Sequence, residues 1–97
     1  MNKLEEWFSE LAKFFRHKTN VILLEKDFVN IVDHRTEIQI QLLPLNLIES
    51  HIFKIVHFAH ERNAIVVIAI DYTKKSIYVY ETDTSTLYIF HLSRLTK

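Results

Sequence analysis

The chain has 97 residues, with 12 basic and 12 acidic side chains, no cysteine and no glycine. Balanced charge argues against a partner held by bulk electrostatics, such as duplex DNA or an anionic membrane surface. The missing cysteines exclude disulfides and thiolate metal sites, and the missing glycines exclude phosphate-binding loops, dinucleotide fingerprints and nucleophile elbows.

The first predicted element is an amphipathic helix from Leu4 to Phe15. Its apolar residues recur at helical spacing and form one stripe, and Asn2 is placed to cap the helix with Glu5 three residues on. Because strands that need cover follow, we expect the stripe to pack in the core rather than on a membrane surface. The stripe consists of Leu4, Trp7, Phe8, Leu11, Phe14 and Phe15.

Shorter segments come next. Val21 to Leu24 is an apolar run that predicts a buried strand, whereas Asp27 to Val32 fits a strand or one helical turn equally well. Thr36 to Leu42 predicts a strand with one face in water, because apolar and polar residues alternate along it.

A second helix is predicted after Pro44, which ends the preceding strand. Asn46 is placed to cap this helix, with Glu49 three residues on, and the helix runs to about Arg62. At the angular spacing of an α-helix one face is apolar, and His51 lies on the same side. That face consists of Leu47, Ile48, Ile52, Ile55, Val56, Phe58 and Ala59.

Phe53 interrupts the polar face of the second helix, where His57 and His60 flank it. An aromatic ring on a polar face lowers solubility unless something covers it, so these residues are candidates for contact with a partner. The alternative is that the segment from Asp27 to Arg35 folds over the ring of Phe53.

The last third of the chain predicts an antiparallel meander of strands Ala64–Tyr72, Ser76–Thr82 and Thr86–Leu92, joined by polar turns at 73–75 and 83–85. If each turn is symmetric about its central residue, Lys74 or Thr84, residues that lie opposite each other share a face. One face then collects Ile68, Ile70, Tyr78, Tyr80, Tyr88 and Phe90. The other face collects Val67, Ala69, Ile77, Val79, Leu87 and Ile89.

Both faces of this predicted meander are apolar, so something covers each of them. Either one helix covers each face, or both helices share one face and the aromatic face meets another molecule. The candidate contacts on the aromatic face are Tyr78, Tyr80, Tyr88 and Phe90. An alternative use of that face is to stack the bases of single-stranded nucleic acid, with Lys74, Lys75 and Arg94 at its rims.

No catalytic or metal-binding pattern is complete. Asp71 and His91 flank Ile77 in the predicted register, too far apart for a direct bond, and no serine has a neighbouring base. A metal ion near His57, His60 and Glu61 would need a further ligand, such as Asp33 or His34. We therefore expect no metal, no cofactor and no enzymatic activity.

The sequence thus predicts a single α+β domain, residues 1–97, in which two amphipathic helices pack on a mixed, mostly antiparallel sheet that ends in a three-stranded meander. We expect a small binding protein, accessory or inhibitory, that forms a homodimer or clasps another protein. Plentiful isoleucine and leucine with little alanine favour an AT-rich genome, such as that of a phage, plasmid or virus, or of a low-GC bacterium. Acidic residues interrupt any signal peptide, and the chain lacks cysteine, so we expect a cytoplasmic location.

Overall fold

The computed structural model describes residues 3–24 and 36–93, without the side chains of residues 41 and 42. The predictions that concern Asn2, Asp27 to Arg35 and Arg94 therefore lie outside the described residues. The elements in chain order are α1 (Lys3–Phe15), β1 (Val21–Leu24), β2 (Thr36–Leu43), α2 (Leu45–Glu61), β3 (Val66–Asp71), β4 (Ser76–Glu81) and β5 (Thr86–Leu92).

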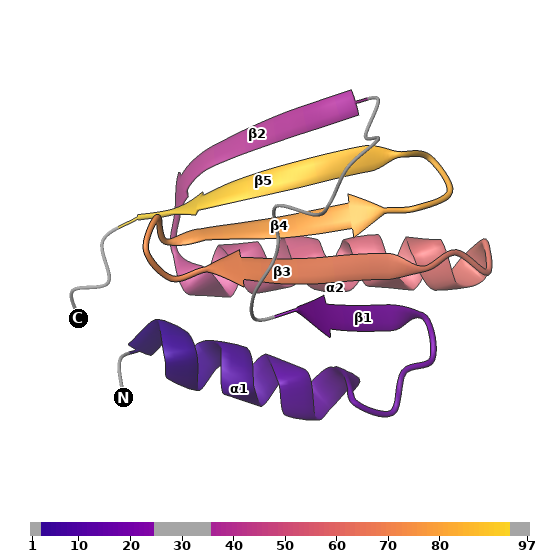
Figure 1. The fold of residues 1–97 in the computed structure, drawn as a ribbon, viewed down its shortest axis with the longest axis horizontal. Helices are drawn as coiled ribbons and strands as arrows, with labels where there is room; N and C mark the ends of the chain where they lie inside the picture. Colours follow the sequence, from indigo (N-terminus) through magenta and orange to yellow (C-terminus); the bar gives the residue numbers. More distant parts are fainter. Residues whose placement is uncertain (1–2, 25–35, 94–97) are drawn as a thin grey trace.

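The strands form one mixed five-stranded sheet in the order β1-β3-β4-β5-β2 (Figure 1). The hairpin-connected strands β3, β4 and β5 are antiparallel and form the expected meander. The outer strand β1 runs parallel to β3, and the other outer strand, β2, runs parallel to β5. β2 is joined to the meander through α2, a connection long enough to permit parallel pairing. The α+β fold class and the two helices are therefore as predicted.

Both helices pack on the same face of the sheet, which we call the helix face. One core cluster contains residues of both helices together with residues of the sheet. Its helix residues are Leu4, Phe8, Leu11 and Phe15 of α1 and Ile48, Ile52, Val56 and Ala59 of α2. In Figure 1, α2 lies behind the meander and α1 lies beyond β1. Burying each large apolar side chain stabilises the fold by about 1.5–3 kcal/mol, so the shared core holds both helices in place. Neither of the two described helices has the length and hydropathy that a membrane-spanning helix requires.

The ends of α2 are formed without a side-chain cap and without glycine. Pro44 precedes the helix in an extended conformation, with φ −71° and ψ 160°, and Asn46 lies inside the helix, so the predicted cap was wrong. At the other end Asn63 takes a left-handed φ of 58°. Its N–H donates to the carbonyl of His60 at 3.0 Å and that of Ala64 donates to Ala59 at 2.9 Å, which is a Schellman motif.

The register of the meander differs from the prediction by one residue at each hairpin. The turns are four residues long, 72–75 and 82–85, so Ile70 pairs with Ile77 and Tyr80 pairs with Leu87. Lys75 and Ser85 close the turns with left-handed φ values of 53° and 54°. A slip of one residue moves the side chains of a strand to the other face of the sheet.

The predicted sharing of one face by four aromatic residues was therefore wrong. The helix face holds Ile68, Ile70, Ile77, Val79, Tyr88 and Phe90. The opposite face holds Val67, Ala69, Tyr78, Tyr80, Leu87 and Ile89. On that opposite face Asp71 and His91 flank Ser76, not Ile77.

Arg62 ties the C-terminal end of α2 to the turn between β4 and β5. Its guanidinium donates to both carboxylate oxygens of Asp83, at 2.7 and 3.0 Å, and to Glu81 at 3.0 Å. The nearly buried Glu81 carboxylate also accepts a hydrogen bond from the hydroxyl of Tyr88 at 3.0 Å. The hydrogen bond from Arg62 lowers the pKa of Asp83, and burial, followed by the bond to Glu81, raises the pKa of Tyr88.

Candidate protein-binding groove

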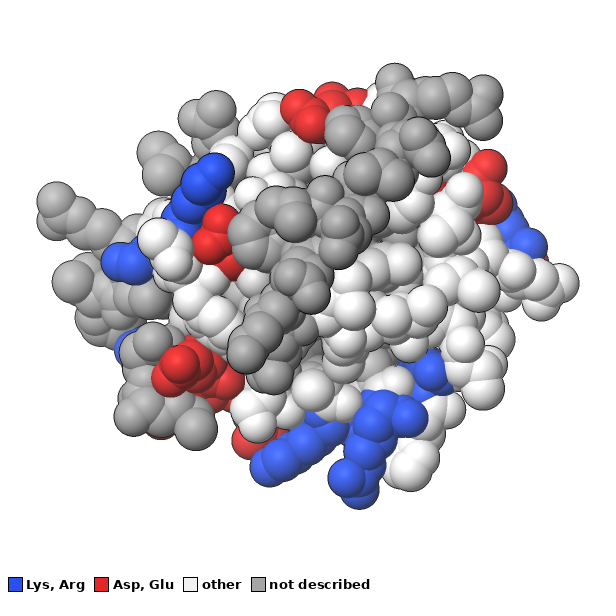
Figure 2. Space-filling view, in the orientation of Figure 1, with Lys and Arg blue, Asp and Glu red and all other residues white. Residues whose placement is uncertain are grey.

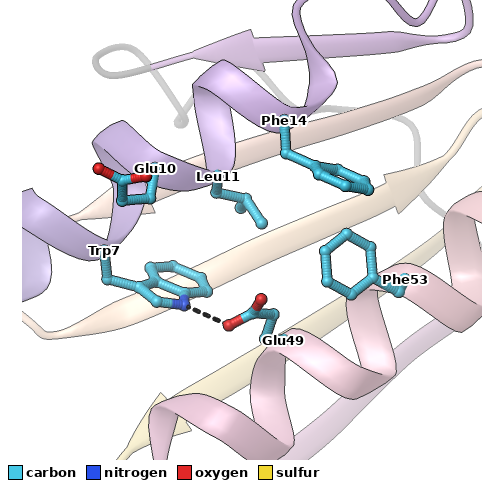
Figure 3. Close-up of a pocket in the computed structure, with 6 residues that line it drawn as sticks. All are labelled: Trp7, Glu10, Leu11, Phe14, Glu49 and Phe53. Atoms are coloured by element: carbon cyan, nitrogen blue, oxygen red, sulfur yellow. Dashed lines mark hydrogen bonds between the residues drawn. The ribbon is translucent and has the colours of Figure 1, made fainter.

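A groove runs between α1 and α2 on the surface of the helix layer. It consists of two adjoining hollows with volumes of about 230 and 210 Å³, and Phe14 and Phe53 line both of them. We call this feature the helix groove. The first hollow is lined in addition by Trp7, Glu10, Leu11 and Glu49 (Figure 3). The second hollow is lined in addition by Phe15, Lys18, Asn20, Val56, His57 and His60.

The centre of the helix groove is aromatic. The two consecutive phenylalanines of α1 point in different directions, so that one enters the core and the other stays at the surface. Phe15 is buried in the core, whereas Phe14 is 58% exposed. Phe53 of α2 packs against both rings, with centroid distances of 4.9 Å to Phe14 and 5.4 Å to Phe15. In Figure 3 the rings of Phe14 and Phe53 lie next to each other, in different planes, at one end of the first hollow. Phe53 is thus partly covered by α1, a contact that the sequence analysis did not predict.

One end of the helix groove is acidic. The indole N–H of Trp7 donates to the carboxylate of Glu49 at 3.2 Å, which links the N-terminal halves of the two helices. Glu10 lines the same hollow and makes an exposed ion pair with Lys13 at 3.5 Å. This end therefore carries two carboxylates beside an aromatic wall, with one lysine at its margin.

The other end of the helix groove is basic. Lys18, His57 and His60 line it, so the structure brings both predicted histidines to the surface beside Phe53. The Nε2 atom of His57 lies 3.3 Å from the carboxylate of Glu61. Among the described residues no group of three or more His, Asp or Glu side chains is placed to hold a metal ion.

Exposed apolar side chains also occur on the other flank of α2. Leu47 and Phe58 are 45% and 55% exposed, although the helical pattern assigned them to the core face. The apolar arc of α2 is wider than the surface that the sheet offers, so its margins stay in water. Phe58 lines neither hollow of the helix groove, although its ring lies 5.5 Å from that of His57, and it matches Phe14 in residue type and exposure.

The aromatic residues predicted for one sheet face do not assemble into a stacking platform. Tyr88 and the fully buried Phe90 lie on the helix face, whereas Tyr78 and Tyr80 lie on the opposite face. Burial, and then the charge of Asp71, raises the pKa of Tyr78. Lys74 and Lys75 are exposed in the turn between β3 and β4. Figure 2 shows the opposite face, where the described Lys and Arg side chains lie near the edges and form no continuous basic band.

Ser76 and His91 form a hydrogen-bonded pair that the predicted register had separated. The Ser76 hydroxyl lies 3.1 Å from Nδ1 of His91, and Nε2 of His91 lies 2.9 Å from the side-chain oxygen of Gln39. A hydroxyl, an imidazole and an amide in line resemble a nucleophile, a base and an orienting group. However, Ser76 is only 1% exposed, so a substrate cannot reach its hydroxyl in this conformation. The arrangement instead links β4, β5 and β2 across the sheet.

No family model, curated protein sequence or solved structure matches this chain.

Proposed function

We propose that this chain is a non-enzymatic binding protein whose helix groove receives apolar side chains of a protein partner. The observation that carries the proposal is the ring of Phe14, which is 58% exposed, lines both hollows of the groove and packs edge-to-face against Phe53. The finer proposal is an accessory or inhibitory protein of a phage, plasmid or virus that acts in the cytoplasm. Its support is the isoleucine- and leucine-rich composition without cysteine.

The helix groove has the composition of a protein interface. The centres of such interfaces are aromatic and apolar, and their rims are polar. Residues whose removal weakens binding most are often aromatic side chains in desolvated pockets. Trp7, Phe14 and Phe53 form an aromatic centre of this kind, and the charged side chains at the two ends form the rim. Covering the 58% of Phe14 that is exposed is worth about 1–2 kcal/mol, in proportion to the value for burying a whole side chain, which is enough to make Phe14 a principal contact.

A selection of random peptides displayed on phage, with the full chain immobilised, tests this proposal. We expect peptides rich in aromatic and aliphatic residues, and we expect Phe14→Ser to weaken their binding about tenfold or more, since about 1.4 kcal/mol corresponds to a factor of ten. Phe58→Ser is the control, because Phe58 is exposed to nearly the same extent, 55% against 58%, but lies outside the groove. Peptides that lose binding equally with both variants, or with neither, would contradict the proposal.

A further inference from the structure

Acidic and basic side chains are distributed asymmetrically along the helix groove. Acidic side chains lie at one end, basic side chains lie at the other, and the aromatic centre lies between them. Along α1 the groove meets Glu10 and then Phe14, and just beyond the C-terminal end of α1 it meets Lys18. Along α2 it meets Glu49, then Phe53, then His57 and His60. Both sides of the groove therefore place carboxylates at one end and basic side chains at the other.

From this order we infer that the partner in the groove is a second copy of this chain, docked groove to groove and antiparallel about a two-fold axis. The inference rests on the proposed function and names its partner. A half-turn about an axis near Phe14 brings the acidic end of each copy against the basic end of the other. A parallel arrangement would place carboxylates on carboxylates and basic side chains on basic side chains.

The aromatic centre is suited to a position on the two-fold axis. In a two-fold interface the same patch is used by both copies, so a side chain near the axis meets its own counterpart or that counterpart's neighbours. Phe14 lines both hollows and is the most exposed of the large apolar side chains that the structure describes. Antiparallel docking covers the ring of Phe14 in each copy with the groove of the other.

Charges beside the groove reduce the contrast between its ends but do not reverse it. Lys13 pairs with Glu10 at the acidic end, and Glu61 lies 3.3 Å from His57 at the basic end. Exposed ion pairs at the rim of an interface contribute little affinity and mainly set its orientation. The aromatic centre therefore supplies the affinity, and the charged ends select the antiparallel orientation.

Sedimentation equilibrium of charge-reversed variants tests the inference. Glu10 and Lys18 are both exposed, so Glu10→Lys and Lys18→Glu leave the core intact. Each variant alone places like charges together at both ends of an antiparallel dimer, and we expect self-association to weaken about tenfold relative to wild type. An equimolar mixture of the two variants, and the double variant by itself, restore opposite charges at both ends and should recover wild-type association.

Several results would overturn the inference. They are a wild-type chain that stays monomeric at high concentration, a dimer that Phe14→Ser does not weaken, and single variants that the mixture does not rescue. The peptide selection separates this failure from failure of the proposed function. A monomeric chain whose selected peptides still depend on Phe14 retains the groove as a binding site and loses only the second copy as its partner.

Discussion

Lys75 provides a sharp test of how a chain without glycine forms its hairpins. Its φ of 53° lies in the left-handed region, where a side chain costs about 1–2 kcal/mol, whereas glycine adopts it freely. Replacing a loop residue by glycine also costs about 0.4–1 kcal/mol, because the unfolded chain gains freedom. The difference predicts that Lys75→Gly raises the free energy of unfolding by about 0.5–1 kcal/mol, from the same two terms.

Lys74→Gly is the matched control for this prediction. Lys74 is the neighbouring lysine in the same turn and is also exposed, but its φ is not positive. Only the unfolded-state term applies there, so we expect Lys74→Gly to lower the free energy of unfolding by about 0.4–1 kcal/mol. The two substitutions remove the same side chain and should act in opposite directions.

Urea denaturation followed by the fluorescence of the single, partly buried Trp7 measures both effects. Thermal unfolding should show a rise of about 2–8 °C for Lys75→Gly, given the usual scaling for a domain of this size. If Lys75→Gly destabilises the protein as much as Lys74→Gly does, the left-handed conformation at Lys75, and with it the four-residue turn that sets the register, is refuted.

Other predictions concern the polar contacts that hold the sheet and the end of α2. Because Arg62 lowers the pKa of Asp83, this carboxylate stabilises the fold above about pH 4, and that contribution is lost as pH falls toward the lowered pKa. Thermal unfolding of Asp83→Asn should therefore change less than that of wild type below about pH 4, and equal acid sensitivity would contradict the role of Arg62. The raised pKa of Tyr88 affects stability at alkaline pH. The contribution of Tyr88 to the free energy of unfolding is present below about pH 10 and is lost as pH rises through the raised pKa. Tyr88→Phe should flatten the alkaline loss of stability and remove one late-titrating phenol from the absorbance titration, and an unchanged titration would show that Tyr88 is not the group concerned. Ser76→Ala removes the hydroxyl bonded to His91 and should lower the free energy of unfolding by about 1–2 kcal/mol, whereas the exposed Ser50→Ala should change it by less than about 0.5 kcal/mol.

Element positions were predictable because the hydrophobic periods are strong. The stripe from Leu4 to Phe15 and the run from Val21 to Leu24 match the bounds of α1 and β1 to within one residue. The predicted burial of β1 was wrong, because it is an edge strand in which Ile22 is 45% exposed. The meander strands were also located, and the last of them, Thr86–Leu92, has the predicted bounds. In these segments local pattern and tertiary packing favour the same structure.

Face assignments in the meander were not predictable from the same information. The polar segments at 73–75 and 83–85 are equally compatible with three-residue and four-residue turns in a chain without glycine to mark the left-handed position. Lys75 and Ser85 occupy the left-handed position in these turns, and neither residue type predicts a left-handed conformation from the sequence. A difference of one turn residue was enough to divide the predicted aromatic face between the two sides of the sheet.

The candidate groove was predictable in part. Phe53 stood out because it interrupts a polar helix face, and His57 and His60 were placed beside it correctly. Phe14 was assigned to the core with its neighbour Phe15, although adjacent positions on a helix diverge and both cannot point inward equally. The approach of α1 to α2, which joins Phe14 to Phe53, is a tertiary contact that no local pattern specifies.

The central claim, that the helix groove binds a protein partner, is tested most directly by NMR on the labelled chain as a selected peptide is added. The single tryptophan gives one indole N–H signal, which reports on the contact between Trp7 and Glu49 at the acidic end of the groove. We predict that this signal and those of Phe14, Phe53 and His57 shift or broaden together, while those of Leu47 and Tyr80 remain in place. Shifts confined to Tyr78, Tyr80 and the turn at Lys74 would contradict the claim and assign binding to the opposite face of the sheet.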